Sequence, residues 1–315
     1  MRKNVLSRFL FIGVILNGLL FVVHITLIGQ SLSDGTHINP NVNASPWEAT
    51  GVMITVLDPR QNELRTGDIV LAIEAVPLAT WVENLFCLSN NCPILPAPTL
   101  AQGAELTYTI LRDGQTQNVT AALRPYPFGE VVRRSWGGLT FAAVSYLIFT
   151  ALFLKRPQED SVHALVLAAA GLLGSMGWAF GLDTVAILTG TSFWLYRFAT
   201  ETVYWLSVIG ILHFALVFPK PLPFIERHSW LIPALYPAVF LLYIITLMLY
   251  SQTTPNKLLW LAYLFNAQSI VVTLCYGLAL LSLLINYRQL TQDSERQQMR
   301  IIFFTSGLII LLSIA

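Results

Sequence analysis

The sequence predicts an α-helical multi-pass membrane protein with a small β-rich (α+β) domain inserted after its first membrane span. Of its 315 residues, 55% are hydrophobic and only 11% are charged, whereas soluble domains carry about 25% charged residues. Long apolar runs recur along the chain, and one water-compatible segment, residues 30–135, separates the first run from the others. With a formal net charge of +1 and no basic cluster, the chain lacks the surface that nucleic acid requires. We therefore expect the lipid bilayer, and no nucleic acid, as a partner.

The first predicted span runs from about Phe9 to Gly29 and follows Arg2, Lys3 and Arg8. A cleaved signal peptide also begins with positive charge, but its apolar region has roughly 7–15 residues and ends at a small-residue cleavage site. Here the apolar run has about 20 residues and ends in Leu-Ile-Gly-Gln-Ser, which favours an uncleaved anchor. Residues 1–29 are thus expected to be a cytoplasmic N-terminus and a transmembrane helix.

Six further apolar runs predict a transmembrane bundle over residues 136–315. They lie at approximately 137–154, 161–182, 197–218, 229–250, 258–286 and 301–315. A helix over the fifteen residues of the last run rises roughly 22 Å, less than the roughly 30 Å of a bilayer's hydrocarbon core. We expect this last span to be truncated, with more of the protein beyond residue 315.

The charges of the short loops predict the orientation, because Lys and Arg are retained on the cytoplasmic side. If the N-terminus is cytoplasmic, ten basic residues lie inside, while only Arg197 and Lys257 lie in short outer loops. The ten are Arg2, Lys3, Arg8, Lys155, Arg156, Lys220, Arg227, Arg288, Arg296 and Arg300. This bias places residues 30–135 outside the cell membrane.

Residues 30–135 have the pattern of short strands and turns. Residues 51–58 alternate and are rich in β-branched side chains, Gly67-Asp68 precedes the apolar strand 69–73, and Thr80 is a candidate cap of a short helix. Residues 105–111 and 116–123 flank an Asp-Gly turn, which predicts a hairpin. One face of the hairpin is expected to pair Leu106, Tyr108 and Ile110 with Val119, Ala121 and Leu123.

This order of elements resembles the PDZ domains of bacterial envelope proteins. The likeness covers about residues 47–125 and rests on Leu64-x-x-Gly-Asp-Ile-Val-Leu-Ala-Ile73 and on the hairpin that turns at Arg112-Asp113-Gly114. It implies capture of a peptide C-terminus as an added strand, with a binding loop formed by Ala49, Thr50, Gly51, Val52 and Met53. Because Thr50 stands where such loops usually carry a hydrophobic residue, the alternatives of a spacer or a dimerisation module stay open.

Cys87 and Cys92 belong to the same domain, in Cys-Leu-Ser-Asn-Asn-Cys-Pro. Two thiols this close in an oxidising compartment are typical of a small disulfide loop. A metal site would need more ligands, and no His or third Cys lies nearby in the sequence. We therefore expect a disulfide and no metal.

The whole arrangement resembles the input half of bacterial sensor histidine kinases of the competence quorum-sensing type. The features that carry the likeness are the anchor, the outer PDZ-like domain and a helical bundle containing His213-Phe-Ala-Leu-Val-Phe-Pro219 and Arg296-Gln-Gln-Met-Arg300. The resemblance implies a homodimer in a two-component signalling system that senses a peptide or membrane-borne ligand. Its kinase domains would lie beyond residue 315, so we expect neither catalytic residues nor a cofactor in this chain.

Glu201 is the ionisable residue of most interest within a predicted span, because a charge in lipid is costly unless it is paired or faces a cavity. Arg197 precedes it by four residues, on the same face of a helix. Two interpretations stay open: an interfacial ion pair between Arg197 and Glu201, or a site that senses a ligand or gates a rearrangement.

Enzyme classes that use membrane helices find little support in the sequence. A zinc metalloprotease needs His-Glu-x-x-His, and no His in this chain is followed by Glu. The Gly174-Ser175-Met176-Gly177 segment is more typical of a close helix contact than of a nucleophile, and the paired broken helices of transporters are not evident. The alternative to a sensor is a non-enzymatic, PDZ-bearing membrane scaffold or tether.

Overall fold

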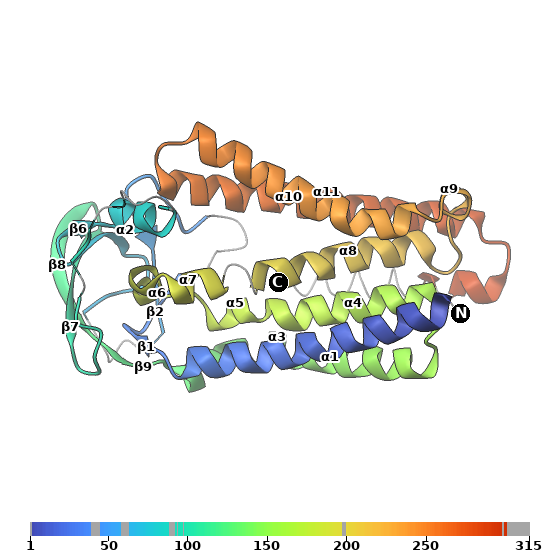
Figure 1. The fold of residues 1–315 in the computed structure, drawn as a ribbon, viewed down its shortest axis with the longest axis horizontal. Coiled ribbons are helices and arrows are strands. Elements are labelled where there is room, and N and C mark those ends of the chain that lie inside the picture. Colours follow the sequence, from blue (N-terminus) through green and yellow to red (C-terminus); the bar gives the residue numbers. More distant parts are fainter. Residues whose placement is uncertain are drawn as a thin grey trace.

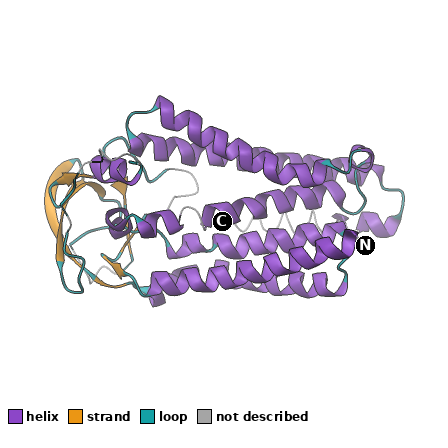
Figure 2. Ribbon diagram, viewed as in Figure 1, coloured by secondary structure: helices purple, strands orange, loops and turns teal. Residues whose placement is uncertain are grey.

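A helical bundle forms most of the molecule, and a small antiparallel sheet lies across one of its ends (Figure 1). The computed structural model describes residues 2–38, 45–57, 63–87, 92, 94–96, 98–196, 200–297 and 299–300. We call the end of the bundle that carries the sheet the sheet end, and the opposite end, where the N-terminus lies, the far end (Figures 1 and 2).

Helices occupy all six of the predicted spans that fall within the described residues, and the seventh, 301–315, lies outside them. The main helices are α1 (Arg2–Gly29), α3 (Phe128–Lys155), α4 (Asp160–Ser175), α8 (Thr202–Val217), α10 (Leu231–Thr253) and α11 (Lys257–Gln289). In the part of the chain described, four helical segments are long and apolar enough to cross a membrane: Arg8–Gly29, Phe128–Lys155, Asp160–Phe180 and Lys257–Gln289. Two shorter apolar helices, Val203–Val217 and Leu231–Ile245, complete the bundle. These lengths and compositions indicate a multi-pass membrane protein.

Glycines set how closely α4 and α8 approach each other at the centre of the bundle. A Cβ atom added to Gly171 would lie 2.2 Å from the backbone nitrogen of Ser207, and one added to Gly210 would lie 2.7 Å from that of Ala168. Small residues allow such backbone contact, which replaces the hydrophobic driving force that is missing between helices in lipid. The α4 helix consequently has the most buried apolar stretch of the four long segments.

The sheet has the strand order β3-β5-β7-β8, with β6 paired to β5. Its strands are β3 (Val52–Met53), β5 (Ile69–Ile73), β6 (Val76–Pro77), β7 (Glu105–Arg112) and β8 (Gln115–Ala122). Two small ribbons join it to the bundle: β1 (Leu32–Ser33) pairs with β9 (Arg124–Pro125), and β2 (Thr36–His37) pairs with β4 (Thr55–Val56). The ribbons involve the segments that leave α1 and enter α3, so the sheet is tied to two helices.

The predicted hairpin is confirmed, with strands 105–112 and 115–122 in place of the predicted 105–111 and 116–123. Tyr108 pairs with Val119 and Leu106 pairs with Ala121, and all four side chains are buried. The turn contains Asp113 and Gly114, both with positive φ, as a two-residue hairpin loop requires.

Two local predictions were wrong. The strand predicted over residues 51–58 is divided, because Val52–Met53 pairs with β5 while Thr55–Val56 turns to pair with β2. The short helix α2 (Leu78–Leu85) begins two residues before Thr80, after Pro77, and has no side-chain cap. The pairing with β2 overrode the local pattern of the strand, whereas α2 begins directly after Pro77.

One ion pair holds the sheet's central turn. Arg112 donates from Nε to Oδ1 of Asp68 at 2.8 Å and from Nη2 to Oδ2 at 2.7 Å, and the Asp68 side chain is only 2% exposed. Asp68 also accepts from the backbone nitrogen of Arg65, and Arg112 reaches the carbonyl of Glu63. The pair therefore fixes the turn before β5 against the end of β7.

We expect Arg112→Met to destabilise the sheet by about 2 kcal/mol or more, because it leaves the buried Asp68 carboxylate without its cation. Hydrogen exchange of the β5 and β7 amides in the membrane-reconstituted chain measures this loss. The matched control is Arg65→Met, an exposed arginine at the same turn, which should change protection little. Equal protection in both variants would contradict this role of the ion pair.

Candidate site at the junction of sheet and bundle

A buried carboxylate joins three separate segments at the sheet end. Asp34 lies between β1 and β2 and is wholly buried. Its Oδ1 accepts from the backbone nitrogen of Thr36 at 2.9 Å and from the Thr36 hydroxyl at 2.6 Å. Its Oδ2 accepts from the Tyr108 hydroxyl on β7, at 2.8 Å, and from the Thr184 hydroxyl on α6 (Thr184–Thr189). These four donors compensate the cost of burying the carboxylate and connect the sheet to the bundle.

A second carboxyl group, Asp183, lies close to the first. It accepts a hydrogen bond from the backbone nitrogen of Ala186 at 2.8 Å and so caps α6. Burial, together with the nearby Asp34, raises the pKa of Asp183 to about 7. Burial also raises the pKa of Tyr108 well above its usual range, and Asp34 acts in the same direction. The junction thus favours the protonated form of both groups.

His37 closes the junction against the bundle. Its ring packs on Gly181, where an added Cβ would lie 1.6 Å from Nε2 and where φ is +69°, so the position requires glycine. The next residue, Ile38, donates from its backbone nitrogen to the carbonyl of Leu182 at 2.6 Å. Burial lowers the pKa of His37 to about 4, so the imidazole is neutral at physiological pH.

Beside this junction lies a cavity of about 480 Å³ with aromatic walls. Its aromatic residues are Trp47, Trp178, Phe193, Tyr196, Tyr204, Phe265 and Tyr276. Trp47 comes from the segment before β3, whereas the others come from α5 (Gly177–Phe180), α7 (Thr191–Tyr196), α8 and α11. We call it the junction cavity, because both the bundle and the segments next to β2 and β3 line it.

Glu201 places a carboxylate on the wall of the junction cavity. Its side chain is 5% exposed and accepts a hydrogen bond from the Tyr243 hydroxyl on α10. Gln268 and Thr273 of α11 add polar groups to the lining of the same cavity. Arg197, the partner of Glu201 in one of its two expected roles, lies outside the described residues.

The candidate peptide-binding loop, residues 49–53, is engaged by the rest of the chain. The edge of β3 that faces away from β5 is hydrogen bonded to the preceding segment: Met53 N donates to Pro46 O at 2.8 Å, and Glu48 N donates to Gly51 O at 2.9 Å. The side chain of Asn256, which caps α11, donates to Ala49 O at 2.7 Å. Thr50 is exposed. A peptide strand added at β3 would have to replace the contacts of Pro46 and Glu48.

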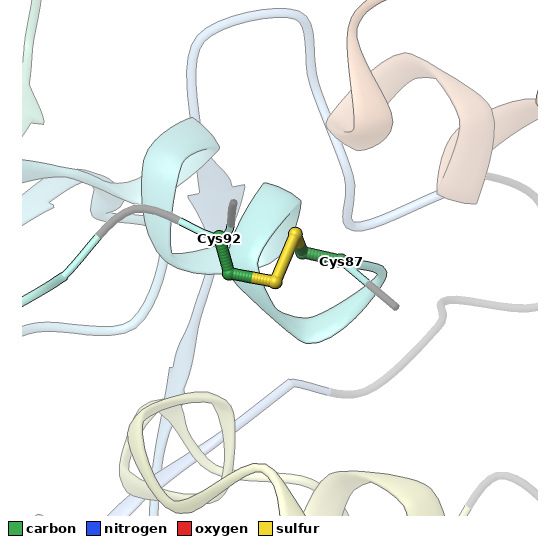
Figure 3. The surroundings of a disulfide bond; sticks show 2 residues. All are labelled: Cys87 and Cys92. Carbon is green, nitrogen blue, oxygen red and sulfur yellow. A yellow bond between two sulfur atoms is a disulfide. The ribbon is translucent and has the colours of Figure 1, made fainter. Parts of the chain in front are cut away.

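Cys87 and Cys92 are joined by a disulfide directly after α2 (Figure 3). The residue before it, Phe86, packs edge-on against Phe193 and Trp260, with ring centroids 6.1 and 4.5 Å away. Phe193 lines the junction cavity, so the disulfide braces a segment that supports its wall. Among the described residues, no group of three or more His, Cys, Asp or Glu side chains could hold a metal ion.

Sequence reasoning missed the two neighbouring buried carboxyl groups, Asp34 and Asp183. Asp34 occurs in Ser-Asp-Gly-Thr and Asp183 precedes Thr184, patterns that indicate a turn and a helix cap. No local signal links two residues almost 150 positions apart. Glu201 was identified, because a charge within an apolar run is conspicuous.

Comparison with protein-family models, with curated proteins and with solved structures finds no match to this chain.

The raised pKa of Asp183 predicts a pH-dependent stability. The unfolded chain releases this proton near pH 4, whereas the folded chain keeps it until about pH 7. Folding therefore binds a proton between these values, so stability should fall as the pH rises from about 4 to 7 and then level off. In Asp183→Asn, which cannot ionise, that decline should be smaller.

Thermal unfolding of the reconstituted protein between pH 4.5 and 8 measures this difference. Glu105→Gln, an exposed carboxylate at the start of β7, is the control and should follow the wild type. An Asp183→Asn variant with the wild-type slope would show that another group causes the pH dependence.

Proposed function

We propose that this chain is the sensory input region of a bacterial signal-transduction protein, and that the junction cavity binds its ligand. The observation that carries the proposal is the dual lining of this cavity by the sheet region and by the bundle. A ligand that contacts both parts can favour one arrangement of them over another. Binding energy is converted into a conformational signal only through such differential contact.

The shape and chemistry of the junction cavity limit the class of ligand. Its volume of about 480 Å³ lies within the roughly 300–1,000 Å³ of small-molecule sites. Aromatic walls favour a bulky apolar group, while Glu201 and Gln268 offer hydrogen-bonding groups. We therefore infer an amphipathic ligand: a peptide that carries an apolar side chain, or a molecule that arrives through the membrane.

We infer that the sheet region has a PDZ-like fold but does not bind its ligand at the strand edge that PDZ domains use. Its hairpin, strand order and helix α2 are compatible with that fold, but its free strand edge is covered by Pro46 and Glu48. We infer that the ligand is read at the junction rather than as an added strand. The domain then acts as one wall of the site and as the part that moves.

The charge bias of the loops supports an orientation in the membrane, and the resemblance to sensor kinases supports an output and an oligomeric state. We infer that the N-terminus and the far end face the cytoplasm, and that the sheet lies outside. Kinase output is then carried by further domains, and the working unit is a homodimer.

A scaffold or tether without signalling output is the second candidate. The hydrogen bonds that Tyr108 and Thr184 donate to Asp34 favour it, because they hold the sheet on the bundle in one arrangement. The two candidates differ in one measurable property: only a sensor changes this arrangement when its ligand binds.

Distance measurements between spin labels distinguish these candidates. Labels are placed at Gln115→Cys, on the exposed hairpin turn, and at Leu241→Cys, an exposed position of α10, in a Cys275→Ala background. We expect a fraction of conditioned medium or of membrane extract to shift the distance distribution. In Glu201→Gln the required concentration should rise about 10- to 100-fold, the cost of losing a hydrogen bond to a charged group.

The matched control is Glu83→Gln, an exposed carboxylate on α2 outside the junction cavity, which should respond as the wild type does. If no fraction changes the distance at any concentration, the chain is a static tether and the sensory proposal fails. A shift that Glu201→Gln leaves unaltered would place the ligand elsewhere.

A further inference from the structure

A second cavity, at the far end of the bundle, has a volume of about 610 Å³. It lies between α1, α4, α8, α9 (Pro223–Arg227) and α10. Of these helices, α8 also lines the junction cavity, and the two linings share no residue. Leu10, Leu167, Leu206 and Ile232 form much of its apolar lining. We call it the far-end cavity, and its interpretation is independent of the sensory function proposed above.

His213 brings a polar group into this apolar setting. The side chain is 5% exposed, and its Nδ1 lies 2.9 Å from the hydroxyl of Tyr236, with which it shares a hydrogen bond. Both residues line the far-end cavity. The second ring nitrogen of His213, Nε2, is buried and has no hydrogen-bond partner among the residues that the structure describes. A buried polar atom in that condition costs about 1–3 kcal/mol, which a hydrogen-bonding ligand would recover.

The charges around the far-end cavity disfavour an anionic ligand. Asp160 and Glu226 line it, and within the described ranges none of its lining residues is Lys or Arg. His163, the other histidine of the lining, lies with Nε2 2.8 Å from the carbonyl of Pro157 and with Nδ1 4.0 Å from Asp160. Lys220, near this end, pairs with Glu295 at 2.8 Å. A carboxylate or phosphate head group would therefore meet like charge.

We propose that the far-end cavity binds a single-chain membrane lipid with an uncharged hydroxyl head group, of the monoacylglycerol class. A hydroxyl both donates and accepts, so it can satisfy Nε2 in either tautomer of His213. The alkyl chain lies along the leucines. The surrounding bilayer is the source, because α1 and α10, which form two of the walls, also expose apolar side chains such as Leu16 and Leu241 on their outer faces.

Photolabelling of the full chain in lipid nanodiscs tests this assignment. The probe is a monoacylglycerol with a diazirine in its chain, and crosslinked peptides are identified by mass spectrometry. We expect labelling on α8 and α10, within residues 206–217 and 232–236. Unlabelled monoolein should compete at least 10-fold better than oleate or oleylamine, which carry the same chain with an anionic or a cationic head group.

Two variants address the site by different means. His213→Phe keeps a ring and removes both nitrogens, and should weaken labelling about 3- to 10-fold, the value of one neutral hydrogen bond. Leu206→Trp leaves His213 intact and fills the space, and should abolish labelling. His228→Phe is the matched control, since His228 is exposed and outside the lining, and it should label as the wild type does.

The helical circular dichroism and thermal midpoint of each variant separate a lost site from a lost fold. Wild-type labelling in either His213→Phe or Leu206→Trp would overturn the assignment. Preferential competition by oleylamine or by oleate would overturn the head-group class and indicate a cationic or an anionic ligand instead.

Discussion

The hydrogen bonds of the Asp34 carboxylate are the interaction on which the rest of this structure depends. A carboxylate without exposure to water is stable only when donors surround it, and here those donors belong to the turn after α1, to the sheet and to α6. The donors of one segment compensate the burial of the Asp34 carboxylate fully only if the other two segments also supply theirs. This shared acceptor therefore positions the sheet on the bundle, together with the hydrogen bonds from Ile38 to Leu182 and from Asn256 to Ala49.

The bundle meets a different constraint. In lipid, helices associate through close packing and not through exclusion of water, and Gly171 and Gly210 allow α4 and α8 to touch along their backbones. Two cavities lie towards the ends of the bundle. One cavity has Glu201 on its wall and the other has His213. The α8 helix lines both cavities, through Tyr204 in one and Leu206 and His213 in the other, and so connects the two sites.

Prediction from the sequence succeeded where the signal is local and repeated. Apolar runs identified the six main helices of the described residues, four of which are long and apolar enough to cross a membrane. Alternation with an Asp-Gly turn identified the hairpin, whose strands differ from the predicted ones by one residue at three of their four ends. It failed where the outcome depends on a partner: residues 51–58 form two strands because β5 and β2 compete for them. Glu201 was identified by its charge, whereas the cavity around it requires side chains from four helices and from the sheet region.

By itself the sequence determined that the chain has long apolar helices and one small β-rich insertion, because hydrophobicity and its period act over a few residues. It also identified the close pair Cys87 and Cys92. Only the tertiary structure decided that the free edge of β3 is covered by residues 46–48, that Asp34 and Asp183 lie together, and that two cavities occupy opposite ends of the bundle. Those features depend on segments far apart in the sequence, by 150 positions for the bond between Asp34 and Thr184 and by more for the cavity linings, and no local pattern encodes such a distance. Burial and hydrogen bonding determine them once the segments meet.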